Sequence, residues 1–121
     1  MINETLDTVR ELYASRSYDV ALSRLDDYEE NYELTAEMLL LKGRLIQLSE
    51  KGDRSLLDAK KCFLSALRQD KESVNTLLEL GWLCASVLGE PEEGKKYFSK
   101  VMEKCATLRE EAIKGLNACQ E

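Results

Sequence analysis

Apolar residues recur every three or four positions along most of the chain, which predicts a protein built from amphipathic helices. In the segment Asp58–Asp70 most positions are charged or polar, and one side of the predicted helix carries Ala59, Phe63, Ala66 and Leu67. Small residues on a helix face let a neighbouring helix approach closely, and a large residue between them fills the remaining space. The segment therefore predicts a tightly packed pair of helices.

The same order of small and large residues occurs three times. The spacing of Ala59, Phe63 and Ala66 is repeated by Ala21, Leu25 and Tyr28 and by Gly94, Phe98 and Val101. Another amphipathic segment precedes each copy, and its matching positions are Leu39, Gly43 and Ile46 in one case and Leu77, Gly81 and Cys84 in the next. In the first copy, Val9 stands at the glycine position and Leu12 at that of Ile46. The chain thus contains three related helix pairs.

At these positions the chain resembles the tetratricopeptide repeat family, whose 34-residue helix-turn-helix unit has the pattern W-x2-L-G-x2-Y followed by A-x3-F. The resemblance covers about residues 3–105 and is best in "LLELGWLC" and "DAKKCFLSAL". Leu39 and Leu77 replace the tryptophan, and no proline closes the repeats. The resemblance implies an all-α, right-handed solenoid with repeats at about 3–34, 35–72 and 73–106.

Helix boundaries are marked by residues with special backbone preferences. Gly52 and Gly89 suit the left-handed residue that ends a helix, and Pro91 suits the first turn of the next one. Ser17 is placed as an N-cap. Thr107 and Glu110 have capping-box spacing, which predicts a separate seventh helix at about 107–119. That helix would cover the apolar end of the array and complete a single domain over residues 1–121.

The composition limits the classes of partner. Acidic residues outnumber basic ones 23 to 17 in 121 residues, and no run of Lys or Arg exists that could follow a phosphate backbone. Nucleic acid is therefore not an expected partner. The longest mainly apolar run, residues 36–41, is too short to cross a bilayer, and the first residues lack the order of a signal peptide. We expect a cytoplasmic protein that does not enter membranes.

The residue types argue against a catalytic, cofactor or metal site. The sequence contains no histidine, and its four cysteines, at 62, 84, 105 and 119, form no C-x-x-C pair, so we expect thiols. Without histidine a cysteine nucleophile lacks its usual base. The segment "GEPEEGKK" has phosphate-loop spacing, but Glu90, Glu92 and Glu93 would repel phosphates, and a helix precedes it. We expect neither an enzyme nor a cofactor.

In tetratricopeptide arrays the first helix of each repeat lines a concave groove that binds partner segments. Carried onto this sequence, the resemblance places in that groove Arg10, Tyr13, Leu40, Arg44, Gln47, Leu78 and Trp82, beside Asn3, Leu6, Glu37, Asn75 and Ala85. Arg10, Arg44 and Trp82 occupy equivalent positions in successive repeats. For Trp82 an alternative role is packing against the closing helix. Arg and Trp are the residue types that most often dominate protein binding. The first hypothesis is a non-enzymatic protein-protein interaction module or scaffold.

One specialised form of this groove is not expected. Repeat domains that clamp the acidic tails of heat-shock chaperones use Lys, Asn and Arg at set positions. Here the corresponding residues are Leu6, Arg10, Leu41, Asn75 and Glu79.

The acidic segment "DDYEENYE" suggests a second hypothesis. Its carboxylates and tyrosines could bind a basic protein through Asp26, Asp27, Glu29, Glu30 and Tyr32, as in an immunity protein, antitoxin or secretion chaperone. The net charge of −6 agrees with this function. The plainer interpretation is a solvated helix face. A third hypothesis is self-association as a homodimer, because three repeats are near the lower limit for an isolated array.

Overall fold

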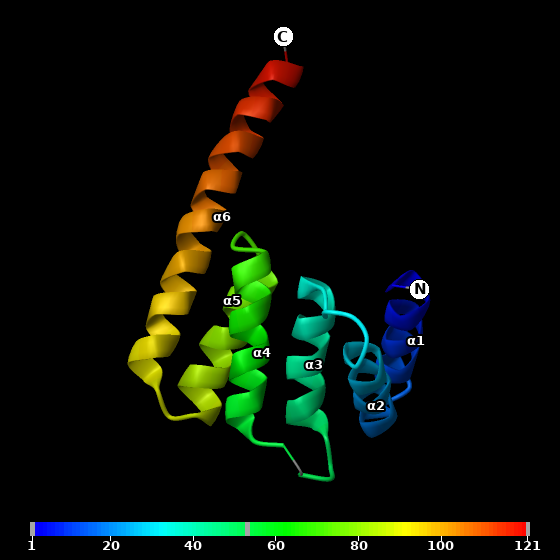
Figure 1. Cartoon of the computed structure of the whole chain (residues 1–121). Helices are drawn as coiled ribbons and strands as arrows, with labels where there is room; N and C mark the ends of the chain where they lie inside the picture. Colours follow the sequence, from blue (N-terminus) through cyan, green and yellow to red (C-terminus); the bar gives the residue numbers. More distant parts are fainter. Residues whose placement is uncertain (1, 53, 121) are drawn as a thin grey trace. The chain divides into compact units, whose positions relative to one another are not determined.

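A computed structural model describes residues 2–52 and 54–120, and in these ranges the chain is helical, with no strand (Figure 1). The helices are α1 (Ile2–Ala14), α2 (Tyr18–Glu29), α3 (Ala36–Leu48), α4 (Leu56–Gln69), α5 (Val74–Trp82), the π-helical segment η1 (Leu83–Val87) and α6 (Pro91–Cys119). The chain divides into two compact units, with the boundary between Lys71 and Glu72. The all-α class predicted from the sequence is confirmed.

In the first unit, α1 and α2 form one antiparallel pair, and α3 and α4 form another (Figure 1). Two of these helices begin with a short polar residue that acts as an N-cap. The Thr35 hydroxyl accepts a hydrogen bond from the Met38 amide. Ser55 and Asp58 form a complete capping box at the start of α4. Ser17 precedes α2 as expected, but its hydroxyl makes no capping hydrogen bond.

The core of the first unit contains the predicted small and large residues. A Cβ added to Gly43 in α3 would lie 2.4 Å from Cε1 of Phe63 in α4, which is too close for any side chain. Phe63 itself is fully buried. In the first pair the difference in size is smaller, because Val9 and Leu25, both fully buried, stand at the glycine and phenylalanine positions.

Three tight turns use left-handed backbone. Gly52 has φ +64° and Gly89 has φ +67°, so both glycines adopt the conformation predicted for them. The α1–α2 turn places Arg16 at φ +64° without a glycine. There the Ser17 amide donates to the Leu12 carbonyl at 2.8 Å, which closes α1 as a Schellman-type turn.

In the second unit, α5 and its continuation η1 pack antiparallel to α6 (Figure 1). The glycine and phenylalanine relationship recurs here, since a Cβ on Gly81 would lie 2.6 Å from Cε1 of Phe98. In η1 the helix widens, and the Leu88 amide donates to the Leu83 carbonyl at 2.9 Å. Gly94 at the start of α6 approaches this wide turn closely: an added Cβ would lie 2.8 Å from Cβ of Ala85.

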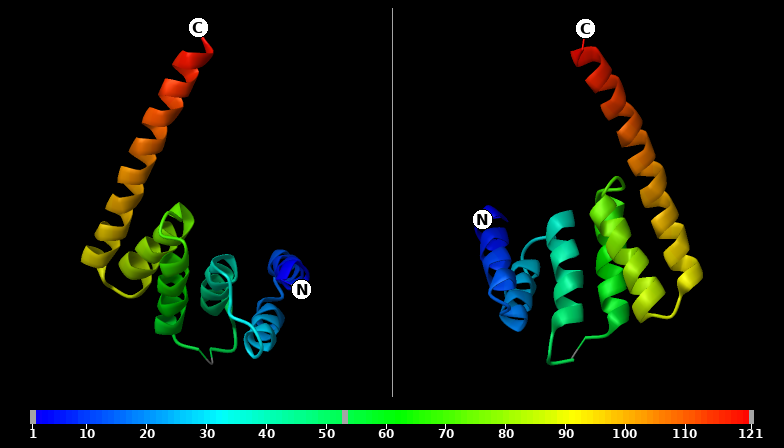
Figure 2. Two further views of the ribbon diagram at one scale, coloured as in Figure 1. Left: turned by 45° about the horizontal axis from the view of Figure 1, so that its top comes forward. Right: turned by 180° about the vertical axis from the view of Figure 1, so that it is seen from behind.

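The prediction of a separate seventh helix beginning at Thr107 is wrong. Residues 91–119 form one continuous helix of 29 residues, and the Thr107 hydroxyl donates to the Glu103 carbonyl inside it at 3.2 Å. No glycine or proline lies between Gly94 and Gly115 to stop the helix. All residues from Cys105 to Gln120 are exposed, so this half of α6 covers no apolar face of its unit and extends beyond the start of α5 (Figure 2).

Candidate functional site

The structure brings together two of the groove positions in the first unit. The guanidinium of Arg10 in α1 forms an ion pair with Glu37 in α3, and it also lies 3.7 Å from the Asp7 carboxylate. Arg10 and Glu37 were predicted to line the same groove wall in successive repeats. Their contact has a chemical consequence, because a carboxylate from a partner would have to displace Glu37 to reach Arg10.

The other groove positions of the first unit are partly covered. Tyr13 is half-buried and packs edge-on against Tyr18, with ring centroids 5.8 Å apart. Three residues follow one face of α3, all of them half-buried: Leu40, Arg44 and Gln47. Leu6 is only 8% exposed and belongs to the core, so its predicted place in the groove is wrong. The Asn3 side chain lies outside the described part of the structure.

Trp82 is exposed, whereas the other described apolar residues predicted for the groove are buried or half-buried. It is 62% exposed, and its ring meets Phe98 edge-to-face with centroids 5.2 Å apart and an interplanar angle of 73°. Leu78 and Ala85 lie on the same side of this helix and are half-buried. Leu78, Trp82 and Ala85 follow one another at helical spacing along α5 and η1, with Trp82 and Ala85 next to α6, and we define the three residues as the Trp82 strip.

Two of the acidic residues singled out in the sequence are engaged by cations. Lys42 donates to Oε1 of Glu29 at 2.8 Å and lies 3.8 Å from Asp26, while Arg54 pairs with the other oxygen of Asp26. The Lys42 side chain is only 14% exposed. These four residues therefore form a partly buried ion-pair network that holds the end of α2 against α3, rather than a free acidic face.

Three other carboxylates in the same region remain without cations. Asp27, Glu30 and Glu33 are exposed, and the described residues place no Lys or Arg within ion-pair distance of them. The acidic face is thus smaller than predicted and is shifted toward the α2–α3 connection. Tyr32 is 53% exposed beside this face, and its ring lies 5.0 Å from that of Tyr28.

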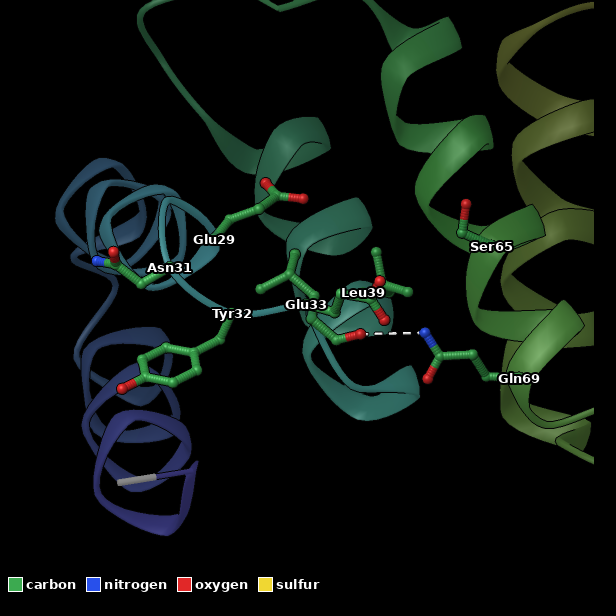
Figure 3. Close-up of a pocket in the computed structure, with 8 residues that line it drawn as sticks. Glu29, Asn31, Tyr32, Glu33, Leu39, Ser65 and Gln69 are labelled. Carbon is green, nitrogen blue, oxygen red and sulfur yellow. Dashed lines mark hydrogen bonds between the residues drawn. The ribbon is translucent and has the colours of Figure 1, made fainter.

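A hollow of about 470 Å³ opens next to these acids (Figure 3). Its lining comes from the end of α2, the α2–α3 connection, α3 and α4: Glu29, Asn31, Tyr32, Glu33, Leu34, Leu39, Ser65 and Gln69. Ser65 and Gln69 lie on the α4 side, and the side chains of Asn31 and Tyr32 point away from α4 (Figure 3). The Gln69 side-chain amide donates to the Leu34 carbonyl at 3.0 Å. Sequence reasoning missed this hollow, because no spacing pattern connects residues 29–39 with residues 65–69.

The cysteines differ in their surroundings. All four carry thiols: Cys62 and Cys84 are buried, and Cys105 and Cys119 are exposed on α6. Burial raises the pKa of the Cys62 thiol, and the nearby Lys42 ammonium only partly opposes this effect. A raised pKa disfavours the thiolate, so Cys62 has the character of an inert core residue.

No group of three or more metal-ligating side chains converges within residues 2–52 and 54–120. In the same ranges, no helix has the length and apolar character needed to cross a membrane. Comparisons with protein-family models, with curated proteins and with solved structures give no match to this chain. The hypotheses about function therefore depend on the geometry of the chain itself.

Proposed function

We propose that this chain is a non-enzymatic protein-binding module and that the Trp82 strip contacts the partner. One observation carries this proposal: Trp82 is 62% exposed although it packs on a fixed neighbour. The neighbour is Phe98, whose ring fills the space left by the missing side chain of Gly81. The indole is therefore presented on a rigid support, which lowers the entropy lost on binding.

The physical chemistry of tryptophan agrees with a role in binding. An indole supplies a large apolar area and one N–H donor, and tryptophan is enriched among the residues that dominate interface energies. Half-buried Leu78 and Ala85 extend the apolar surface on either side of the ring. The π-helical turn begins directly after Trp82, and such turns occur often at functional sites.

The tetratricopeptide architecture is part of the same proposal. The second and third helix pairs each contain the same kind of internal contact. Phe63 packs over Gly43 in the second pair, and Phe98 packs over Gly81 in the third. The ion pair between Arg10 and Glu37 joins the first helices of the first two pairs. These relationships support helix pairs of the tetratricopeptide kind, with Arg10, Tyr13, Leu40, Arg44 and Gln47 as groove residues in the first unit and Leu78 and Trp82 as groove residues in the second.

The test is an affinity measurement on a partner identified by affinity capture. Trp82→Ala should weaken binding at least about tenfold, as expected for the loss of a central aromatic contact, and Trp82→Phe should weaken it less. Val87→Ala is the matched control, because Val87 is 47% exposed in the same helix but lies off the Trp82 strip. An unchanged affinity for Trp82→Ala would exclude the strip as the contact surface.

A second candidate function is the capture of a whole basic protein, supported by the carboxylates of Asp27, Glu30 and Glu33, which form no ion pair within the part of the chain that the structure describes. Charge complementarity of this kind mainly raises the association rate. Replacing these three acids by lysine should slow association strongly at low salt and only weakly at high salt. Asp26 and Glu29 are left unchanged, because their loss would disrupt the ion pairs with Lys42 and Arg54.

A further inference from the structure

We propose that the hollow beside the α2–α3 connection receives the lysine or arginine side chain of a basic segment in a partner protein. This inference depends on the second candidate function and specifies where one partner residue would be held.

The lining of the hollow combines apolar and acidic side chains. Leu34 is buried and Leu39 is half-buried, while Glu29 and Glu33 are exposed. A lysine or arginine side chain has the same division, with an aliphatic stem and a charged end. The stem can therefore cover the leucines while the charged end reaches the carboxylates.

The charge of the lining favours a cation. Its eight residues include two carboxylates and neither a lysine nor an arginine. Lys42, which is not part of the lining, already neutralises Glu29, so Glu33 is the carboxylate left to bind a cation. Glu33 has no cation partner among the described residues, and Lys42 engages only one oxygen of Glu29. Because the Gln69 amide nitrogen is used by the Leu34 carbonyl, the side-chain oxygen of Gln69 remains as a third acceptor. Hydrogen bonds between a cation and a carboxylate are stronger than hydrogen bonds between neutral groups.

The hollow exists before any ligand arrives. The 3.0 Å hydrogen bond from Gln69 to the Leu34 carbonyl joins α4 to the α2–α3 connection across one side of the hollow. The pair between Lys42 and Glu29 holds the opposite side. A preformed site loses little free energy to reorganisation when it binds.

The test uses the full chain labelled with ¹⁵N and titrated with three capped pentapeptides in NMR. The peptides have the form acetyl-Gly-Ser-X-Ser-Gly-amide, with lysine, arginine or uncharged norleucine at X. We expect the two basic peptides to shift amide signals of residues 29–39 and 65–69, and the norleucine peptide to leave them unchanged. Signals that move equally for norleucine would overturn the charge recognition proposed for this hollow.

Two variants separate recognition in the hollow from general attraction to an acidic protein. Glu33→Gln should weaken binding of the lysine peptide about fivefold or more, the effect of one charge-assisted hydrogen bond. Glu50→Gln removes the same charge from an exposed residue that does not line the hollow, and it should have little effect. Equal weakening by both variants would show attraction by net charge alone and would reject the site.

A third variant distinguishes binding in the hollow from binding at the Trp82 strip. Trp82→Ala should bind the lysine peptide as the unmodified chain does, because Trp82 does not line the hollow. If the peptide fails to bind while Trp82→Ala still weakens a captured partner, the hollow is rejected and the Trp82 strip is kept.

Discussion

The ring of Phe63 in α4 occupies the space that any side chain at residue 43 in α3 would need. An added Cβ would lie 2.4 Å from Cε1 of that ring, and Phe63 is fully buried, so the ring has no room to withdraw. Gly43 is thus required for packing, and its backbone conformation is ordinary helix.

Gly43→Ala should therefore destabilise the protein by about 1–3 kcal/mol, the usual cost of overpacking a core. Gly115→Ala is the matched control, since nothing lies within 4 Å of a Cβ added there. That change should stabilise the exposed part of α6 by up to about 1 kcal/mol, because alanine favours helix more than glycine does. Urea unfolding of both variants measures the difference, and a loss of stability of similar size in both would contradict the close contact.

The two sites with capping-box spacing should respond differently to alanine. Ser55→Ala should cost about 1 kcal/mol of unfolding free energy, because Ser55 caps α4 through the Asp58 amide. Thr107→Ala should be neutral or slightly stabilising, since Thr107 lies inside a continuous helix and alanine is the better helix former. Urea unfolding and helical circular dichroism test both changes. A clear loss of helix in Thr107→Ala would contradict the continuous helix and support a separate helix that begins at Thr107.

The buried thiol of Cys62 should make stability depend on pH in the alkaline range. Because burial raises its pKa, the folded state holds the proton more tightly than the unfolded chain does. Its contribution is complete below the ordinary thiol pKa of about 8.5 and is lost as the pH rises through the higher folded value. The difference in unfolding free energy between the unmodified chain and Cys62→Ala should therefore shrink above about pH 8.5.

Alkylation with iodoacetamide provides a second measurement on the cysteines. In the folded protein Cys105 and Cys119 are exposed and should be modified first, while Cys62 is buried and should react only after unfolding. Mass spectrometry of the digested protein identifies the modified positions. Modification of Cys62 as fast as that of Cys105 would contradict its burial.

The features that the sequence predicts correctly have local causes. Gly52, Gly89 and Pro91 mark helix ends because their backbone preferences act within one turn. The repeated small and large residues predict the helix pairs, because residues three and four apart share one face. These signals are enough for the helices and for most of the core.

The errors and omissions arise from contacts between segments far apart in the chain. Leu6 satisfies the groove spacing, but packing makes it a core residue. The acidic run could not show that Lys42 and Arg54 neutralise Asp26 and Glu29, because these cations come from later segments. At Thr107 the helix does not start anew despite the capping-box spacing, because helix-forming residues continue without interruption on both sides.

The exposed half of α6 is expected to form and open differently from the packed half. Starting a helix is the unfavourable step, and the half of α6 that packs on α5 has already completed it, so the residues after Cys105 need only extend existing turns. Their hydrogen bonds nevertheless have no packing to protect them. Backbone amides in the exposed residues 105–120 should therefore exchange with solvent faster than those near Tyr97, which lie in the packed half of α6.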